Sequence, residues 1–146
     1  MFRFRKSKGF TLIELIMVVV ILGILAAIAI PKYIDLSTNA KINATKSSLG
    51  TIRAAIAMSY AQTAASGATP TYPTLAALTA TGASSLFVGG SMPTDAYVNS
   101  SATAAGANNP ISGADFTNVG GWVYNATTGE IRCNVSEATA TGCHSW

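Results

Sequence analysis

The hydrophobic residues of this 146-residue chain are concentrated in one run near its start. Of the 21 residues from 10 to 30, 18 are apolar, and the exceptions are Thr11, Glu14 and Gly23. At about 1.5 Å per residue, a helix of this length is roughly 30 Å long, which is the thickness of the hydrocarbon core of a bilayer. The run therefore predicts a membrane-spanning helix over residues 10–30.

Beyond residue 31 the pattern becomes amphipathic. Larger apolar side chains recur at helical spacing, with polar residues such as Arg53 on an opposite, solvated side. The apolar positions are Ile34, Ile42, Leu49, Ile52, Ile56 and Tyr60. Gly67 followed by Pro70 is typical of a helix end. We therefore expect one helix over about residues 11–66, with an amphipathic second half at 31–66.

The C-terminal part of the chain predicts a β-hairpin. Two runs rich in aromatic and β-branched residues, 120–125 and 130–135, are joined by four residues that end in Gly129. Because side chains alternate along a strand, Trp122 and Tyr124 share one face of the first run.

The segment between helix and hairpin, 67–112, is rich in small and polar residues and predicts mainly loop. Within it, residues 72–78 favour a short helix with a proline near its first turn, and residues 92–95 favour a turn. Together the elements predict an α+β fold, in which the second half of a long helix packs against a small antiparallel sheet of three or four strands. The sheet and the C-terminal cysteines occupy residues 113–146.

Charge is scarce in this chain and unevenly distributed. Only 10% of the residues are charged, against roughly 25% in an average soluble domain. The formal net charge is +3, but four of the nine basic residues lie in the first eight positions. From Phe10 onward there are five basic and six acidic residues, so the net charge is 5 − 6 = −1. A near-neutral outer region argues against strong nucleic-acid binding.

A basic start followed by an apolar run also fits two ordinary targeting segments. One is a secretory signal peptide with cleavage near residues 27–29, although its apolar core usually spans only about 7–15 residues. The other is an uncleaved signal anchor with its positive end in the cytoplasm. Neither explains Glu14, because a carboxylate inside a membrane span costs roughly 2.5–3.5 kcal/mol or more and calls for a partner.

Cleavage between Gly9 and Phe10 would supply that partner. The cut would free an α-amine on Phe10, and Glu14 lies four residues away, about 6 Å along a helix. If the amine and the carboxylate belong to neighbouring subunits, their pairing fixes the stagger of one helix against the next.

The segment KGFTLIEL at residues 8–15 resembles the class III signal of type IV prepilins, a family whose relatives include the pseudopilins of type II secretion. The resemblance implies that a prepilin peptidase removes the leader, residues 1–9, and methylates Phe10. It also implies that Phe10 and Glu14 guide subunit docking. The implied partners are a helical homopolymer, the peptidase and methyltransferase, the inner membrane before assembly, and an assembly machinery with separate ATPases.

The resemblance also assigns roles along the chain: a filament core at 10–30, and a variable surface loop at 67–112. Gly23 and Pro31 bracket the weakest part of the span, since glycine lowers helix stability by about 1 kcal/mol and an interior proline by about 3 kcal/mol. In type IV pili the corresponding segment loses helicity within the filament. The resemblance implies that residues 23–31 do the same here.

Cys133 and Cys143 are the only cysteines. An even count in an exported chain favours a disulfide, with two free thiols as the alternative. The family often carries such a C-terminal disulfide loop, whereas major pseudopilins more often rely on calcium. The pair therefore favours a true pilin.

Other polar residues give weaker signals. Asp95 and Asp115 are too isolated in sequence to indicate catalysis or calcium binding, and His144, the single histidine, is expected to be exposed to solvent. We therefore expect no metal site. Four asparagines begin N-x-[ST] triplets, which arise often by chance in a chain rich in Ser and Thr: Asn43, Asn99, Asn125 and Asn134.

These features predict a structural protein that is not an enzyme and needs no cofactor, since the sequence shows no catalytic triad or phosphate-loop motif. We expect the major subunit of a type IV pilus, first in the bacterial inner membrane and then on the cell surface, serving adhesion, twitching motility or DNA uptake. One alternative is a type II secretion pseudopilin in a short periplasmic filament. Another, of a different class, is a membrane-anchored periplasmic domain that binds a small ligand.

Overall fold

The computed structural model describes residues 9–108, 111–135 and 142–146. The chain divides into two compact units, Met1–Asn39 and Ala40–Trp146, which are called unit 1 and unit 2 below. The expected leader, 1–9, lies outside the described residues except for Gly9.

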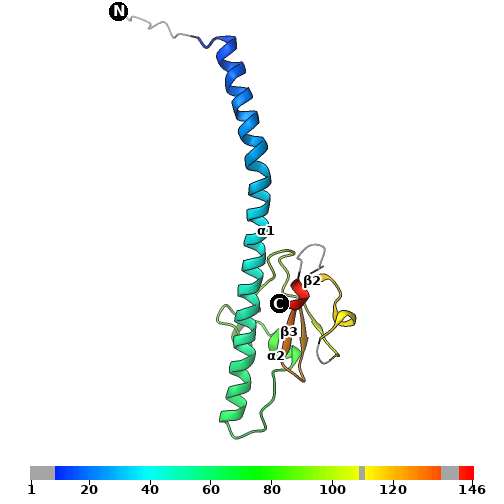
Figure 1. The fold of residues 1–146 in the computed structure, drawn as a ribbon. Helices are drawn as coiled ribbons and strands as arrows, with labels where there is room; N and C mark the ends of the chain where they lie inside the picture. The colour runs from blue at the N-terminus through cyan, green and yellow to red at the C-terminus, as the bar shows by residue number, and fades with distance from the viewer. Residues whose placement is uncertain (1–8, 109–110, 136–141) are drawn as a thin grey trace, which may run out of the picture. The chain divides into compact units, whose positions relative to one another are not determined.

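The longest element is helix α1, Leu12–Ala65, which supplies the described helical residues of unit 1 and the first 26 residues of unit 2 (Figure 1). The expected helix over residues 11–66 is confirmed to within one residue at each end. The chain is α-helical through Gly23 and through Pro31. Among the described residues, α1 is the one helix long and apolar enough to cross a membrane.

The two halves of α1 differ sharply in burial. In unit 2, the expected apolar stripe is buried at Leu49, Ile52 and Ile56. Ile34 belongs to unit 1 and is 59% exposed, so the stripe contributes to a core only after residue 40. Thr45, a polar residue that the stripe did not include, is also fully buried, and its hydroxyl accepts the N–H of Ala96 at 3.1 Å.

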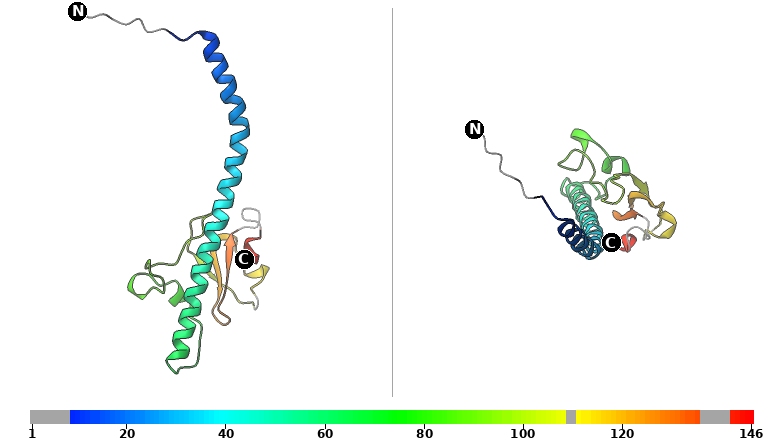
Figure 2. Two further views of the ribbon diagram at one scale, coloured as in Figure 1. Left: turned by 60° about the vertical axis from the view of Figure 1, so that its left-hand side comes forward. Right: turned by 90° about the horizontal axis from the view of Figure 1, so that it is seen from above.

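The sheet of unit 2 has three strands in the order β1–β2–β3. The expected hairpin is confirmed: β2 (Val119–Asn125) and β3 (Glu130–Val135) pair antiparallel, with Trp122 opposite Cys133. Within unit 2, the strands and loops lie beside residues 40–65 of α1 (Figure 2).

Strand β1, Thr103–Ala105, corrects the expectation of a wholly antiparallel sheet, because it pairs parallel with β2. The reason is its connection: residues 106–118 cross over from β1 to β2 and include the 3₁₀ turn η2, Gly113–Asp115. Parallel neighbours need such a crossover of about a dozen residues, which a tight hairpin cannot provide. The Thr-Ala-Ala sequence of β1 carries little β-strand signal of its own.

The core of unit 2 lies between α1 and the sheet. Trp122 and Tyr124 are 0% and 1% exposed and pack with Leu49, Ile52 and Ile56, which confirms that they share the buried face. The expected short helix at 72–78 is present but begins later: α2 spans Leu75–Leu78, residues 72–74 precede it, and the Thr74 hydroxyl accepts the N–H of Ala77 at 3.2 Å. A 3₁₀ turn, η1, follows at Gly82–Ser84.

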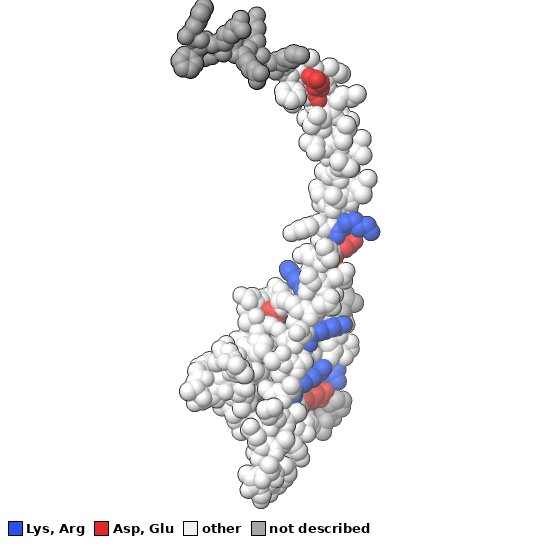
Figure 3. All heavy atoms as spheres, turned by 90° about the vertical axis from the view of Figure 1, so that its left-hand side faces the viewer, with Lys and Arg blue, Asp and Glu red and all other residues white. Residues whose placement is uncertain are grey.

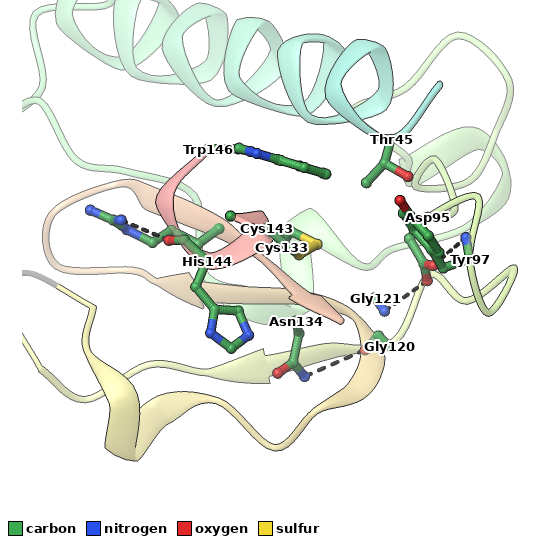
Figure 4. The surroundings of a disulfide bond; sticks show 12 residues. Thr45, Asp95, Tyr97, Gly120, Gly121, Cys133, Asn134, Cys143, His144 and Trp146 are labelled. Atoms are coloured by element: carbon green, nitrogen blue, oxygen red, sulfur yellow. Dashed lines mark hydrogen bonds between the residues drawn. A yellow bond between two sulfur atoms is a disulfide. The ribbon is translucent and has the colours of Figure 1, made fainter. Parts of the chain in front are cut away.

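Asp95 joins the loop before β1 to strand β2. Its buried carboxylate accepts the N–H groups of Tyr97 (2.9 Å), Val98 (2.8 Å) and Gly121 (2.8 Å), as Figure 4 shows for its surroundings. The turn therefore lies at residues 96–98, directly after Asp95, and not at 92–95 as expected. An aspartate whose side chain bonds the main chain two residues on is a common start of such a turn.

Asp115 does the same for the crossover from β1 to β2. Its carboxylate accepts the N–H groups of Ser112 (3.0 Å) and Ala107 (2.8 Å) and the side-chain amide of Asn108 (2.9 Å). These bonds lower the pKa of Asp115 from 3.8 to about 2, with the Ser112 N–H the largest cause. Both aspartates that are isolated in sequence thus hold loops in place.

A disulfide between Cys133 and Cys143 ties the last 3₁₀ turn, η3 (Cys143–Ser145), to β3, as expected (Figure 4). Arg132 donates to the main-chain oxygen of His144 at 2.8 Å. His144 is half-buried with its ring stacked on Phe116 at a centroid distance of 3.7 Å, so the expectation of a solvent-exposed histidine is wrong.

Arg53 lies on the exposed side of the helix, as expected, but it also binds the C-terminal part of the chain. Its guanidinium donates to the main-chain oxygens of Ile131, at 3.2 Å, and of Trp146. The ammonium of Lys46 lies 4.8 Å from the centre of the Trp146 ring. The second half of α1 is therefore bound to β3 and to the C-terminal turn by polar contacts as well as by its apolar stripe.

Candidate functional site at the start of the long helix

The residues expected to be cleaved lie outside the helix. Gly9 and Phe10 have no regular secondary structure, and α1 begins two residues later, at Leu12. The Phe10 side chain is 91% exposed. The expected scissile bond is therefore presented in a non-helical segment, a conformation in which peptide bonds are cut more readily than within a helix.

Thr11 and Glu14 form a reciprocal pair at the helix start. The Glu14 carboxylate oxygen Oε2 accepts the main-chain N–H of Thr11 at 2.8 Å and its hydroxyl at 2.7 Å, and the Glu14 N–H donates to the Thr11 hydroxyl at 3.3 Å. This is a capping box, in which a threonine at the helix cap and a glutamate three residues on satisfy each other's main-chain N–H groups.

The capping box gives Glu14 a neutral partner within the chain, Thr11, which the sequence pattern of charges alone did not indicate. The T-x-x-E spacing of a capping box stands in the sequence at residues 11–14 and would have revealed it. Glu14 thus has a local role in starting α1, in addition to the docking role that stays a prediction.

The capping box uses only one of the two carboxylate oxygens. No described residue donates a hydrogen bond to Oε1 of Glu14. The one basic residue described in unit 1 is Lys32, 18 positions further on, which is roughly 27 Å along a helix. Within the described residues of unit 1, the carboxylate is hydrogen-bonded but has no neighbouring cation.

The rest of this surface is apolar and uncovered. Every large hydrophobic side chain from Phe10 to Leu36 is between 48% and 91% exposed. On the face shown in Figure 3, the described part of unit 1 has an acidic patch near its start, and a long uncharged stretch separates it from the next charged side chains. Soluble monomers rarely expose apolar patches this extensive, so lipid or other protein helices must cover the surface.

Gly23 has no packing role within the chain. A Cβ atom built on Gly23 meets no atom within 4 Å, and its φ is not in the left-handed region. Pro31 lies inside the helix, where it cannot donate a main-chain hydrogen bond. Contacts within the described chain therefore do not explain why a glycine and a proline occupy these two positions. Their role within an assembly stays a prediction.

The polar groups of unit 2 are used to hold its own structure. Glu130 pairs with Arg132 at 2.7 Å and accepts the N–H of Ile111 at 2.9 Å. Although burial raises the pKa of Glu130, these hydrogen bonds outweigh it and lower the pKa overall. Among the described residues, no group of three or more His, Cys, Asp or Glu could hold a metal ion.

Two of the four N-x-[ST] asparagines are also structural. Asn134 is 1% exposed, and its side chain bonds Thr117 and Asn118. Asn125 is 4% exposed and accepts the N–H groups of the hairpin loop. Only Asn43 and Asn99 of the four are exposed.

The clefts of unit 2 do not favour the ligand-binding alternative. One of about 270 Å³ is lined in part by Arg53 and Glu130, but both charged groups are engaged, Arg53 with main-chain oxygens and Glu130 with Arg132. Another, of about 370 Å³, is lined by no charged residue. Binding sites for small ligands usually add a few convergent polar groups to an apolar lining.

Known proteins are similar to the N-terminal part of this chain. Residues 4–30 match the family described as the prokaryotic N-terminal methylation motif. Fimbrial protein EcpB of Eikenella corrodens is 53% identical over 51 residues, which are 35% of this chain and 32% of that protein. Type IV narrow pilus major component PilA5 of Thermus thermophilus is 44% identical over 57 residues, 39% of this chain and 49% of that protein.

Another similar protein is named for type II secretion. Type II secretion system core protein G of Pseudomonas aeruginosa is 46% identical over 54 residues, 37% of this chain and 38% of that protein. The chain therefore covers between 32% and 49% of the lengths of these three relatives. No solved structure matches the chain.

Proposed function

We propose that this chain, a member of the superfamily of type IV pilins and type II secretion pseudopilins, is the major structural subunit of a type IV pilus. The superfamily is structural and not enzymatic. The observation that carries the proposal is a methylation motif that continues into an uncovered apolar helix, with the Glu14 carboxylate at the third residue of that helix. Such a helix suits a subunit that leaves lipid to pack against copies of itself.

The first step is processing of the precursor. Hydrolysis of the Gly9–Phe10 bond by a prepilin peptidase frees the α-amine of Phe10, which is then methylated and keeps its positive charge. The mature chain has 146 − 9 = 137 residues and loses four basic residues with its leader. Until assembly, residues 10–30 span the inner membrane and unit 2 lies on its outer side.

The second step is docking. Lipid tails are as apolar as leucine side chains, so exchanging lipid for a neighbouring helix gives little specificity. A pair between the Phe10 amine of one subunit and the Glu14 carboxylate of its neighbour supplies the register, because both charges are costly in lipid unless they meet. The apolar side chains of residues 10–30 then form the core of the filament.

The remaining segments shape the filament and its surface. The helix between Gly23 and Pro31 loosens in the assembled fibre, where the missing proline donor and the glycine lower helix stability. Unit 2 forms the outer surface, on which adhesion, twitching motility or DNA uptake would depend. Extension and retraction are driven by separate ATPases of the assembly machinery.

A pseudopilin of type II secretion is the second candidate, and the similarity to core protein G favours it. The Cys133–Cys143 disulfide supports the pilus subunit instead, because it stabilises the C-terminal turn without a metal. The two functions differ in where the polymer lies: a pilus extends from the cell surface, whereas a pseudopilus stays in the periplasm.

Intact mass and N-terminal sequencing of the mature chain test the processing on which both candidates rest. We expect a 137-residue chain that begins at methylated Phe10. A mature chain that begins after Ala29 would instead identify a secretory signal peptide, and an uncut chain would identify a signal anchor. Either result would overturn the proposed function.

A further inference from the structure

The capping box leaves Glu14 in an arrangement suited to a second partner. Both Thr11 donors fall on the same carboxylate oxygen, Oε2, at 2.7 and 2.8 Å. Because a carboxylate has about four lone-pair sites on two oxygens, it can keep these bonds and still accept from another group. No described residue bonds Oε1.

We propose that Thr11 is a positioning residue for assembly: its hydroxyl and N–H hold the Glu14 carboxylate by Oε2, so that Oε1 is presented to the amine of a second copy of this chain. The inference rests on the proposed function. In this arrangement the neighbouring amine does not replace Thr11 as the partner of Glu14. The Thr11 bonds to Oε2 are kept when the amine binds Oε1.

Processing leaves this arrangement intact. Cleavage between Gly9 and Phe10 removes neither the Thr11 hydroxyl nor its peptide N–H. Both donors are thus present in the mature subunit. A mature subunit in lipid would then carry a carboxylate that is already hydrogen-bonded, which offsets part of the cost of placing it there.

The gain for docking is entropic. A free glutamate side chain has several rotamers, and immobilising such a side chain in an interface costs association free energy. The Thr11 bonds fix the Glu14 side chain before the neighbour arrives, so docking does not have to fix it. Removing the hydroxyl should weaken docking about fivefold, a factor that corresponds to ~1 kcal/mol.

Three threonine variants test the proposal in the full chain. Thr11→Val keeps the size and removes the hydroxyl, and Thr11→Ser restores a hydroxyl. Thr38→Val is the matched control, because the Thr38 hydroxyl also lies on α1 in unit 1 but bonds only the main-chain oxygen of Ile34, at 3.1 Å. The readout is the fraction of mature chain recovered in sheared filaments at equal expression.

We expect Thr11→Val to be processed at Phe10 like the wild type but to enter filaments about fivefold less well. Thr11→Ser and Thr38→Val should assemble normally. If Thr11→Val assembles as well as Thr38→Val, or if Thr11→Ser assembles as poorly as Thr11→Val, the positioning role is wrong. That outcome leaves the proposed function intact, since wild-type filaments would still form.

A spectroscopic measurement separates positioning from a general effect on the helix. The chain has only three glutamates, Glu14, Glu130 and Glu137, so ¹³C-labelled glutamate gives few NMR signals. In micelles, the Glu14 side chain should show one fixed rotamer in the wild type and Thr11→Ser, and rotamer averaging in Thr11→Val. Equal rotamer averaging of the Glu14 side chain in the wild type and in Thr11→Val would overturn the proposal, whatever the yield of filaments.

Discussion

The carboxylate of Asp95 accepts the main-chain N–H of Gly121 at 2.8 Å, across 26 residues of sequence. Gly121 has a φ of +75°, and a Cβ atom built on it would lie 2.0 Å from the main-chain oxygen of Ala102. The loop, strand β1 and strand β2 thus meet at a residue that must lack a side chain. This contact explains why a glycine directly precedes Trp122.

Gly121→Ala should therefore destabilise unit 2 by about 3 kcal/mol or more, because the new methyl group meets main-chain atoms and the backbone is strained for alanine. Urea unfolding of the full chain in detergent, followed by tryptophan fluorescence, measures the loss. Gly89→Ala is the matched control, since a Cβ atom there meets nothing within 4 Å, and it should change the free energy of unfolding little. Equal stability of the two variants would contradict the close approach.

The depressed pKa of Asp115 predicts an acid-dependent loss of stability. The folded pKa of about 2 lies below the ordinary value of 3.8. The stabilising contribution of the ionised carboxylate is therefore complete above pH 3.8 and is lost as the pH falls through 3.8 toward 2. Urea midpoints of the wild type between pH 5 and pH 2 should fall more steeply than those of Asp115→Asn. Parallel curves would show that Asp115 does not contribute.

The disulfide should stabilise the C-terminal turn by closing a loop of ten residues. In the chain-entropy model this amounts to roughly 2–3 kcal/mol. Replacing both cysteines by alanine should lower the free energy of unfolding by that amount and make it insensitive to reductant. Release of Trp146 from Lys46 should also shift tryptophan emission to the red. A variant with wild-type stability would refute the assigned contribution.

Glu14→Val should insert and be processed but should fail to enter filaments, because the neighbouring amine has no carboxylate to meet in lipid. Glu14→Gln gives a sharper comparison, since glutamine also completes a capping box and so preserves the helix start while removing the charge. Both variants should be absent from sheared filaments and present in the membrane at Phe10-processed mass. Normal polymerisation of Glu14→Gln would show that the charge is dispensable for docking.

Periodicity and composition were sufficient to predict the long helix, the hairpin and the disulfide. The apolar run, the stripe after residue 40 and the aromatic runs around Gly129 each carry a strong local signal. The resemblance to type IV prepilins was carried by residues 8–15. The T-x-x-E spacing at residues 11–14 was equally local, so the capping box was open to prediction as well.

The features that sequence could not provide depend on contacts between distant residues. Strand β1 consists of Thr-Ala-Ala and is defined by its partner β2, and nothing local to Asp95 indicates that it will meet Gly121. Arg53 falls on the polar side of the helical pattern, yet it bonds the main chain of Ile131, 78 residues later. Polar residues that connect loops in this way leave no periodic pattern.

The central claim is that this chain polymerises into a filament on the cell surface. Filaments sheared from intact cells, examined by electron microscopy and by mass spectrometry, test it most directly. We predict fibres composed mainly of this chain, each copy starting at methylated Phe10 and carrying the Cys133–Cys143 disulfide. Recovery of the mature chain only from the membrane and periplasm, with sheared fibres that lack it, would contradict the claim.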